Sequence, residues 1–344
     1  MPTLYAATNG LSVWTSKDLG ETLSRAPSSF GIYSGSQVWA LATHPTKPNE
    51  MLVGTNYGVH RYDQAGNRLH LLKSFKNDIE DFLLVTAIAY NPHNPDVILV
   101  GTQPSALFRS EDGGKSWKNL HVGMKPYLNT GFYAGEQAAN PTSQGEFDVK
   151  HWTRVTGILF DTKDPNLVYA GVEIDGAWRS TDGGKTFVRA NDGFKTADIH
   201  GYGVIEKDGE PILFATTNEG LYRSTDHGLS WEMLPLESKW QYTRSIVARQ
   251  DNSGVMYVTN GNGPPGSSGK LFRSNDFGSS WSEIHLPAEL ESSLYFLAVH
   301  PTDPKLIFAA ANLGQMFRST DGGESWTALK RRLPEVRALA WLPE

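Results

Sequence analysis

The sequence contains no cysteine and no long apolar run among its 344 residues. The missing cysteine excludes disulfide bonds, thiolate metal sites and a cysteine nucleophile. Because a membrane-spanning helix needs about 18 consecutive apolar residues, we expect no membrane span. The first residues, Met1 to Ala6, lack the basic and then apolar segments of a signal peptide, so the sequence predicts a cytoplasmic protein.

Positive charge is also scarce. The chain has 31 Lys and Arg residues against 37 Asp and Glu residues, which gives a formal net charge of −6. Since proteins that bind nucleic acid are usually basic, we expect no nucleic-acid partner. A glycine-rich phosphate loop, a nucleophile elbow and an HExxH zinc motif are absent too, so no motif requires a cofactor.

What the chain has in plenty is glycine (34), tryptophan (10) and tyrosine (13), which favours many short strands joined by tight turns. Five segments share the pattern Ser-x-Asp-x-Gly-x-Ser/Thr followed by an aromatic residue, and two further segments are more degenerate copies. The aspartates at the centres of the seven copies are Asp18, Asp63, Asp112, Asp182, Asp226, Asp276 and Asp321. Their separations are 45, 49, 70, 44, 50 and 45 residues, so the chain is built from one repeated unit.

Each repeat reads as four short antiparallel strands. An apolar run that ends in a Pro or Asp turn, such as 38–45 or 294–301, precedes two further strands, the Ser-x-Asp turn and a last strand. Four strands in about 45 residues are typical of a propeller blade. We therefore predict an all-β protein, a single seven-bladed β-propeller over residues 1–344. The C-terminal strand at 336–343 should complete the N-terminal blade, because that blade lacks a first strand.

The repeated turn has a structural explanation. Its aspartate can accept hydrogen bonds from backbone N–H groups of the turn that follows, and its glycine supplies a positive φ. The closing aromatic residue can bury a large apolar face between blades. We accordingly expect a structural role, and no catalytic one, for Asp18, Asp112, Asp182, Asp226, Asp276 and Asp321.

On these repeats the sequence resembles the Asp-box, or bacterial neuraminidase repeat, superfamily of β-propellers. The segments that carry the resemblance include SEDGGKSW at Ser110, STDGGKTF at Ser180 and STDGGESW at Ser319. The chain is most similar to the single-propeller bacterial proteins described as sialidase-like or glycosyl-hydrolase-like. Sialidases, xyloglucanases, sortilin-like receptors and photosystem II assembly-factor propellers belong to the same superfamily. The resemblance implies the fold, whereas one fold hosts many functions.

The chain departs from several of these relatives. Sialidases resemble one another in an Arg-Ile-Pro segment near the first blade, which this sequence lacks, and they usually have six blades. Xyloglucanases typically use a cleft between two propellers, and this chain is long enough for one. The superfamily resemblance therefore does not by itself imply a substrate.

Two insertions lie on the face of the propeller opposite the Ser-x-Asp turns. The first covers about 121–151, between blades three and four, and is a candidate lid over the channel. The second, 260–269, is rich in glycine, proline and serine and is therefore a loop. Because long insertions on a rigid scaffold often carry function, we expect the ligand site on this face.

Aligned first strands place one column of side chains at this end of the central channel. The column consists of Trp39, Thr86, Thr156, His200, Arg244, Tyr295 and Arg337. Its arginines indicate a positive funnel suited to an anion, although they can also pair with carboxylates and seal a hydrated channel. The residues expected to bind a ligand are Arg154, Arg244, Arg337, Tyr295, Gln103, Asn260 and His151.

His200 is the candidate general base. Asp198 lies two residues earlier, on the same strand face, where it can orient the imidazole, and Glu173 is a possible acid partner. His200 can equally be a hydrogen-bonded histidine without a catalytic task. His151, His200 and Glu173 form an alternative set of ligands for a divalent metal, but no short ligand spacing supports it, so we assign no metal site from the sequence.

The sequence favours a protein that binds a small anionic or carbohydrate-like ligand at the channel mouth, with or without hydrolysis or lyase-type turnover. One alternative is a non-enzymatic scaffold that holds an acidic peptide or protein partner, because propellers often serve this purpose. True sialidase or glycosidase activity is the other, which the missing Arg-Ile-Pro segment disfavours.

Overall fold

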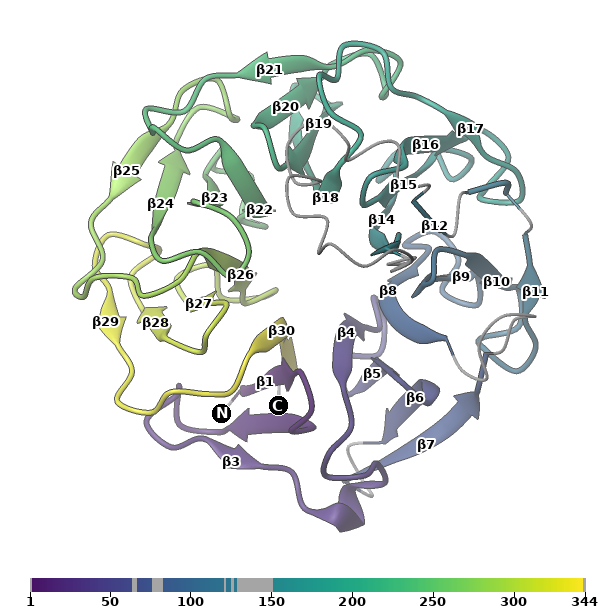
Figure 1. Ribbon diagram of the computed structural model, residues 1–344, viewed down its shortest axis with the longest axis horizontal. Helices are drawn as coiled ribbons and strands as arrows, with labels where there is room; N and C mark the ends of the chain where they lie inside the picture. The colour runs from purple at the N-terminus through teal and green to yellow at the C-terminus, as the bar shows by residue number, and fades with distance from the viewer. Residues whose placement is uncertain are drawn as a thin grey trace, which may run out of the picture.

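The protein is a ring of seven four-stranded antiparallel sheets around a central axis (Figure 1). This computed structural model describes residues 2–63, 67–75, 83–120, 122–124, 127–128 and 151–342, with the backbone alone at 127–128 and 151–152. In blades two to seven consecutive strands are neighbours and the first strand lies nearest the axis, whereas in blade one β30 takes that innermost position beside β1. The predicted all-β, seven-bladed propeller is confirmed.

The strands follow the repeats. Blade one contains β1 (Thr3–Thr8), β2 (Val13–Ser16), β3 (Ser24–Arg25) and β30 (Val336–Leu342). Blade two contains β4 (Val38–Thr43), β5 (Glu50–Thr55), β6 (Gly58–Asp63) and β7 (Arg68–Lys73). Blade three contains β8 (Leu84–Tyr90), β9 (Ile98–Gln103), β10 (Leu107–Ser110) and β11 (Lys118–Asn119). Blade four contains β14 (Val155–Phe160), β15 (Val168–Val172), β16 (Gly176–Ser180) and β17 (Val188–Arg189).

The remaining three blades follow the same order. Blade five contains β18 (Ile199–Lys207), β19 (Glu210–Thr217), β20 (Leu221–Ser224) and β21 (Glu232–Leu234). Blade six contains β22 (Tyr242–Ala248), β23 (Met256–Gly261), β24 (Gly269–Ser274) and β25 (Ser282–Ile284). Blade seven contains β26 (Leu294–Val299), β27 (Ile307–Ala311), β28 (Met316–Ser319) and β29 (Thr327–Ala328).

Two short features lie outside the blades. A 3₁₀ turn, η1 (Ser28–Phe30), follows blade one, and β12 (Tyr127–Leu128) pairs with β13 (His151–Trp152) between blades three and four. Most of the candidate lid at 121–151 lies outside the described residues. Within the described ranges, no helix has the length and apolar character needed to cross a membrane.

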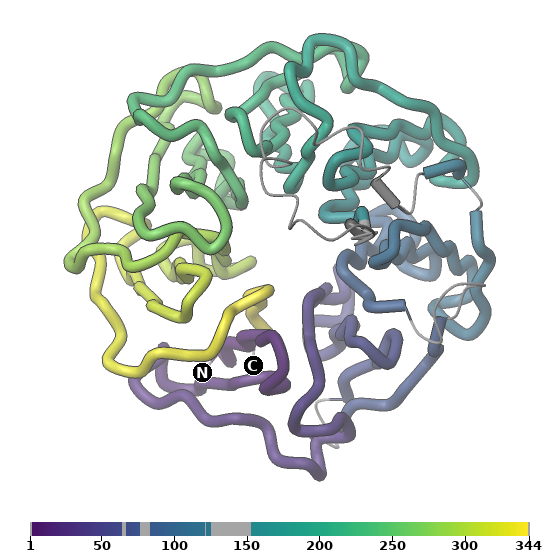
Figure 2. Tube along the Cα trace, in the orientation of Figure 1, coloured from purple at the N-terminus to yellow at the C-terminus, as the bar shows by residue number. Residues whose placement is uncertain are grey.

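The last strand closes the ring. β30 pairs antiparallel with β1, with Thr3 opposite Leu342 and Tyr5 opposite Ala340. Figure 2 shows both ends of the chain in this first blade. The closure was predicted from the repeats, and β30 pairs with the edge of β1 that would otherwise be open.

Glycines in the second strands let neighbouring blades approach closely. A Cβ atom at Gly101 in β9 would lie 2.4 Å from the Val155 side chain of the next blade. At Gly171 in β15 it would lie 2.6 Å from Ile199 in the blade after that. Since such contacts are too short for carbon atoms, these two positions exclude any side chain, and the branched residues of the next first strand fill the space.

The Ser-x-Asp turns are hydrogen-bonded alike. At the turn after β28, the backbone N–H of Ser325 donates to the Asp321 carboxylate over 2.9 Å. The Ser319 hydroxyl donates to the same carboxylate over 2.8 Å and accepts from the Gly323 N–H over 2.8 Å. Equivalent bonds occur at Asp18, Asp112, Asp182, Asp226 and Asp276. In each turn the carboxylate thus serves the local backbone.

Candidate functional site

Seven β-bulges, one near the beginning of the innermost strand of each blade, lie around one end of the central channel. In each blade the pairing of the first strand with the second skips a position near its beginning, as between Val155 and Gly157 or between Ile199 and Gly201. The skipped positions are Trp39, Thr86, Thr156, His200, Arg244 with Ser245, Tyr295 and Arg337. A bulge re-aims the extra side chain, so these bulges direct one residue of each blade away from the regular ladder.

These side chains surround a cavity of about 260 Å³ on the axis. Six of the seven predicted column residues line it: Trp39, Thr86, Thr156, His200, Arg244 and Arg337. Tyr295 is the exception, because it is buried behind Arg244 and its neighbour Phe296 lines the cavity instead. We use the term channel mouth for the end of this cavity that carries Arg154, Arg244 and Arg337.

Three bulge residues also tie blades together. The Thr86 hydroxyl donates to the Val155 carbonyl over 2.6 Å, and the Thr156 hydroxyl donates to the Ile199 carbonyl over 2.5 Å. His200 makes the equivalent contact, from Nδ1 to the Thr243 carbonyl over 2.6 Å. Each bond runs from one bulge to the residue just before the next bulge, so the bulges of blades three to six are linked in series.

Arg154 is fully engaged by a carboxylate. Its Nε lies 2.7 Å from one oxygen of Glu173, and an Nη donates to the other oxygen over 2.9 Å. Arg337 pairs with Glu335, which immediately precedes β30. Both guanidinium groups lie near the Trp39 ring, with the guanidinium carbon of Arg337 at 4.0 Å and that of Arg154 at 5.1 Å from its centroid. Trp39 is therefore an aromatic surface in contact with two cations.

The electrostatics of Arg337 reflect this crowding. Burial lowers the pKa of its guanidinium to about 10; Glu335 opposes the shift, and the charges of Arg154 and Arg244 add to it. Mutual repulsion of three cations at one end of a cavity is unfavourable without anions nearby. Glu173 and Glu335 pair with Arg154 and Arg337 and offset part of this repulsion.

Arg244 differs from the other two arginines because no carboxylate neutralises it directly. Among the described residues it has no ion pair within 4 Å, and its Nη1 is buried without a hydrogen bond. Only 9% of the residue is exposed, and its guanidinium carbon lies 5.1 Å from the centroid of the Tyr295 ring. Burial opposes the charge, but Tyr242 and Glu173 raise the pKa of Arg244 above its ordinary value, so it stays cationic.

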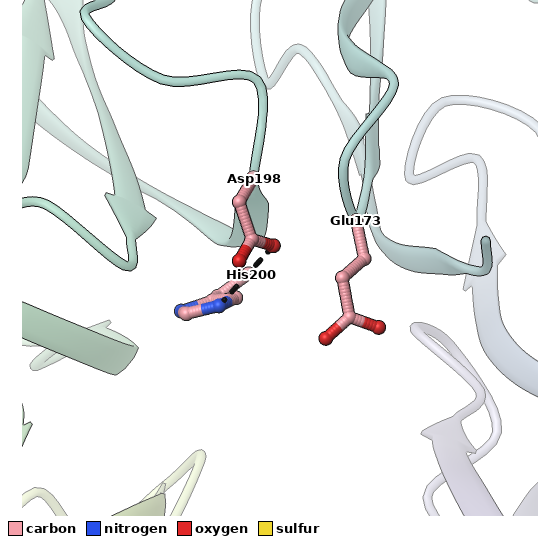
Figure 3. Close-up of side chains that lie close together, drawn as sticks. All are labelled: Glu173, Asp198 and His200. Carbon is pink, nitrogen blue, oxygen red and sulfur yellow. Dashed lines mark ion pairs between the residues drawn. The ribbon is translucent and has the colours of Figure 1, made fainter. Parts of the chain in front are cut away.

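Asp198, His200 and Glu173 converge beside Arg244. Figure 3 shows the Glu173 carboxylate facing the same space as the Asp198 and His200 pair. His200 Nε2 lies 3.4 Å from an Asp198 oxygen, and its side chain is 1% exposed. Burial raises the pKa of Asp198, but the charges of His200, Arg244 and Arg154 outweigh it and hold that pKa below its usual range. The carboxylate is thus ionised at neutral pH.

The geometry of His200 does not favour the catalytic role predicted for it. Nδ1 is bonded to the Thr243 carbonyl and Nε2 faces Asp198, so neither nitrogen is directed at the cavity without a protein partner. A general base needs a nitrogen within reach of the proton that it removes. The catalytic assignment of His200, Asp198 and Glu173 stays a prediction.

The other predicted ligand contacts are separated from this cluster. Asn260, expected to bind ligand, is fully buried, and its amide donates to the backbone carbonyls of Trp240 and Tyr242, so it supports the site from behind. Gln103 ends β9 opposite Leu84 and is not among the residues that line the cavity. The side chain of His151 lies outside the described residues.

Sequence reasoning missed Tyr242. Its ring lies 4.7 Å from that of His200 and stacks on Tyr295 at 6.2 Å, and the two tyrosine hydroxyls are 3.1 Å apart. Burial raises the pKa of Tyr242, which keeps its hydroxyl neutral. The available signal was its position two residues before Arg244 at the start of a first strand.

Comparison with known proteins shows similarity to two groups. Residues 221–341 match the Sortilin-Vps10 family model, described as sortilin, neurotensin receptor 3. Xyloglucanase Xgh74A of Acetivibrio thermocellus is 26% identical over 265 residues, which cover 66% of this chain and 29% of the xyloglucanase. Sortilin of Rattus norvegicus is 26% identical over 240 residues, which cover 67% of this chain and 24% of sortilin. The chain is thus a propeller related to xyloglucanases and sortilins, and its matches span less than a third of these relatives.

Solved structures agree on the fold. The GH74 enzyme of Niastella koreensis superposes with a TM-score of 0.65 at 20% identity, covering 86% of this chain and 45% of that enzyme. A YCF48 structure bound to D1 peptide has a TM-score of 0.54 at 12% identity, covering 85% of this chain and 82% of that one. At such identities the likeness concerns the fold alone. The resemblance to sialidase-like proteins stays a prediction.

Proposed function

We propose that the channel mouth binds an anionic, carbohydrate-like molecule and that Arg244 holds its carboxylate or other acidic group. The observation that carries the proposal is the buried Arg244, whose Nη1 has no hydrogen bond and which has no ion pair among the described residues. A buried guanidinium without a direct counter-charge is costly, and a ligand anion would satisfy it with charge-assisted hydrogen bonds.

The cavity supplies a second kind of contact. Trp39 and Phe296 both line it, and the Trp39 ring already lies near two guanidinium groups. Ligand sites commonly combine apolar walls with a few polar anchors. The similarity to xyloglucanases supports a saccharide as the body of the ligand, with the arginines selecting an acidic one.

Binding is the primary proposal, and hydrolysis or lyase-type turnover would follow from it only if a group could reach the bound sugar. Both nitrogens of His200 already face protein oxygens, so catalysis requires a rearrangement of His200 or a different base. No contact favours an acidic peptide, since the cationic groups converge inside the cavity and not across an open surface.

A titration with matched sugars tests the proposal. Isothermal calorimetry would compare an oligosaccharide that carries uronic acids with a neutral oligosaccharide of equal length. We expect the acidic sugar to bind preferentially, and Arg244→Gln to weaken it about 10- to 100-fold, as expected when one hydrogen-bonded charge pair is lost. Product analysis of the same mixtures would reveal turnover.

Arg332→Gln is the matched control, because Arg332 is an exposed arginine paired with Glu291 away from the cavity. Its affinity should equal that of the wild type. Equal affinity for the neutral and the acidic sugar, or an unchanged affinity in Arg244→Gln, would overturn the proposal.

A further inference from the structure

His200 does more than its structural position requires. In blades three and four the same bulge position holds Thr86 and Thr156, whose hydroxyls bond to the carbonyl before the next bulge. His200 makes this bond with Nδ1 alone. A threonine would serve equally well there, so the link between blades leaves the second nitrogen of His200 unexplained.

The bond to Thr243 also defines where the lone pair of the ring lies. A carbonyl can only accept, so Nδ1 carries the proton, and in the neutral ring Nε2 then presents a lone pair. This lone pair faces an oxygen of Asp198 at 3.4 Å, and that oxygen, Oδ1, is buried without a hydrogen bond. Two electron-rich atoms in such contact need a cation between them, which is either a second ring proton or a metal ion.

We propose that Glu173, Asp198 and His200 form a binding site for one divalent transition-metal ion. One ring nitrogen of His200 and one oxygen from each carboxylate all lie within 4.8 Å of one another, and Nε2 is the nitrogen that faces Asp198. Ligands at about 2.0–2.2 Å from a tetrahedral ion are about 3.3–3.6 Å apart, which suits the 3.4 Å between Nε2 and the Asp198 oxygen. A histidine whose other nitrogen donates to a backbone carbonyl is the usual arrangement of a metal-bound imidazole.

Some of the surrounding charges favour a bound cation at this site and others oppose it. Two carboxylates balance a divalent ion, and Arg154 holds Glu173 by both oxygens, which fixes the orientation of that ligand. Arg244 and Arg337 repel a cation and so lower its affinity. An anion bound at Arg244 would relieve this repulsion, which makes a metal ion and an acidic ligand compatible neighbours.

Cobalt and zinc titrations of the metal-free protein, without any saccharide, test the site. We expect one equivalent of Zn²⁺ by calorimetry, and one equivalent of Co²⁺ with visible absorption bands that report its coordination geometry. His200→Thr should weaken binding at least 10-fold while it keeps the bond between blades, as Thr86 and Thr156 do. Asp198→Asn should weaken binding similarly, because it removes one ligand charge.

Asp208→Asn is the control within the same blade. Asp208 is exposed in the turn between β18 and β19, at a positive φ that asparagine tolerates. The Asp208→Asn variant should therefore bind the metal with the same affinity as the wild type. Thermal melting would verify that His200→Thr remains folded. The proposed metal site would be overturned if the wild type showed no saturable metal binding, or if His200→Thr bound the metal with wild-type affinity. Metal binding without saccharide binding would leave this site intact and reject the proposed function alone.

Discussion

At the scale of single residues, two arginines of the channel mouth should contribute unequally to the stability of the fold. Arg154 satisfies both oxygens of Glu173, whereas Arg244 has no direct counter-ion among the described residues. We expect Arg154→Met to lower the free energy of unfolding by about 1.5 kcal/mol, because Glu173 loses its hydrogen bonds to a cation. Arg244→Met should cost less stability, because Arg244 makes no direct hydrogen bond to a carboxylate of the described chain that would be lost.

Urea denaturation of the ligand-free and metal-free protein measures both effects. The two substitutions are chemically identical, so each is the control for the other. A larger loss of stability in Arg244→Met than in Arg154→Met would contradict the view that Arg244 is held in readiness for a ligand.

The column of channel residues could be predicted from the sequence because it is a repeated position. One residue in each repeat falls at the same bulge, so aligning the repeats found Trp39, His200, Arg244 and Arg337 together. The direction of an individual side chain could not be predicted in this way. Tyr295 shares the bulge position and yet packs behind Arg244, because contacts between blades, which have no repeat in the sequence, decide its rotamer.

At the scale of the element, the repeated turn makes the free energy of unfolding depend on pH in the acidic range. In the turn after β28, the Ser325 hydroxyl and N–H and the Ser319 hydroxyl lower the pKa of Asp321 to about 2. An unfolded aspartate titrates near pH 4, so the unfolded state binds the proton more readily. The turn therefore contributes stability above about pH 4, and this contribution disappears as the pH falls toward 2.

Asp321→Asn should remove this dependence from one turn. We expect the difference in free energy of unfolding between wild type and variant to be largest near pH 6 and to shrink between pH 4 and pH 2. Urea denaturation at a series of pH values measures it, with Asp208→Asn as the exposed control. A difference that stayed constant down to pH 2 would show that ionisation of Asp321 is not what stabilises the turn.

The elements were predictable to the extent that they repeat. Even the degenerate copy around Asp63 keeps its hairpin, in which β6 pairs with β7 and Asp63 lies opposite Arg68. There β6 stays mostly buried between its two neighbours while β7 is mostly exposed at the rim, as in the other blades, although the turn motif itself has changed. The burial of Asn260 could not be predicted, because the sequence does not show that the end of β23 is covered by segment 238–242.

At the scale of the whole molecule, closure of the ring and completion of the site depend on the same strand. β30 covers the open edge of β1, buries Val336, Trp341 and Leu342, and brings Arg337 to the channel mouth. Burying one large apolar side chain contributes about 1.5–3 kcal/mol, so three approach the total stability of about 5–15 kcal/mol that is usual for a folded protein. Loss of this strand should therefore cost both the fold and the ligand site.

A split protein separates the two contributions. We expect residues 1–334 alone to associate through the exposed edge of β1, and a peptide of residues 335–344 to restore a monomer, as judged by size-exclusion chromatography and thermal melting. The same peptide with Arg337→Gln should restore the monomer equally well but bind the acidic sugar more weakly, because it rebuilds the sheet without the third guanidinium. A peptide of scrambled order should restore neither. If residues 1–334 alone were monomeric and melted like the full chain, the ring would not depend on β30 for its closure.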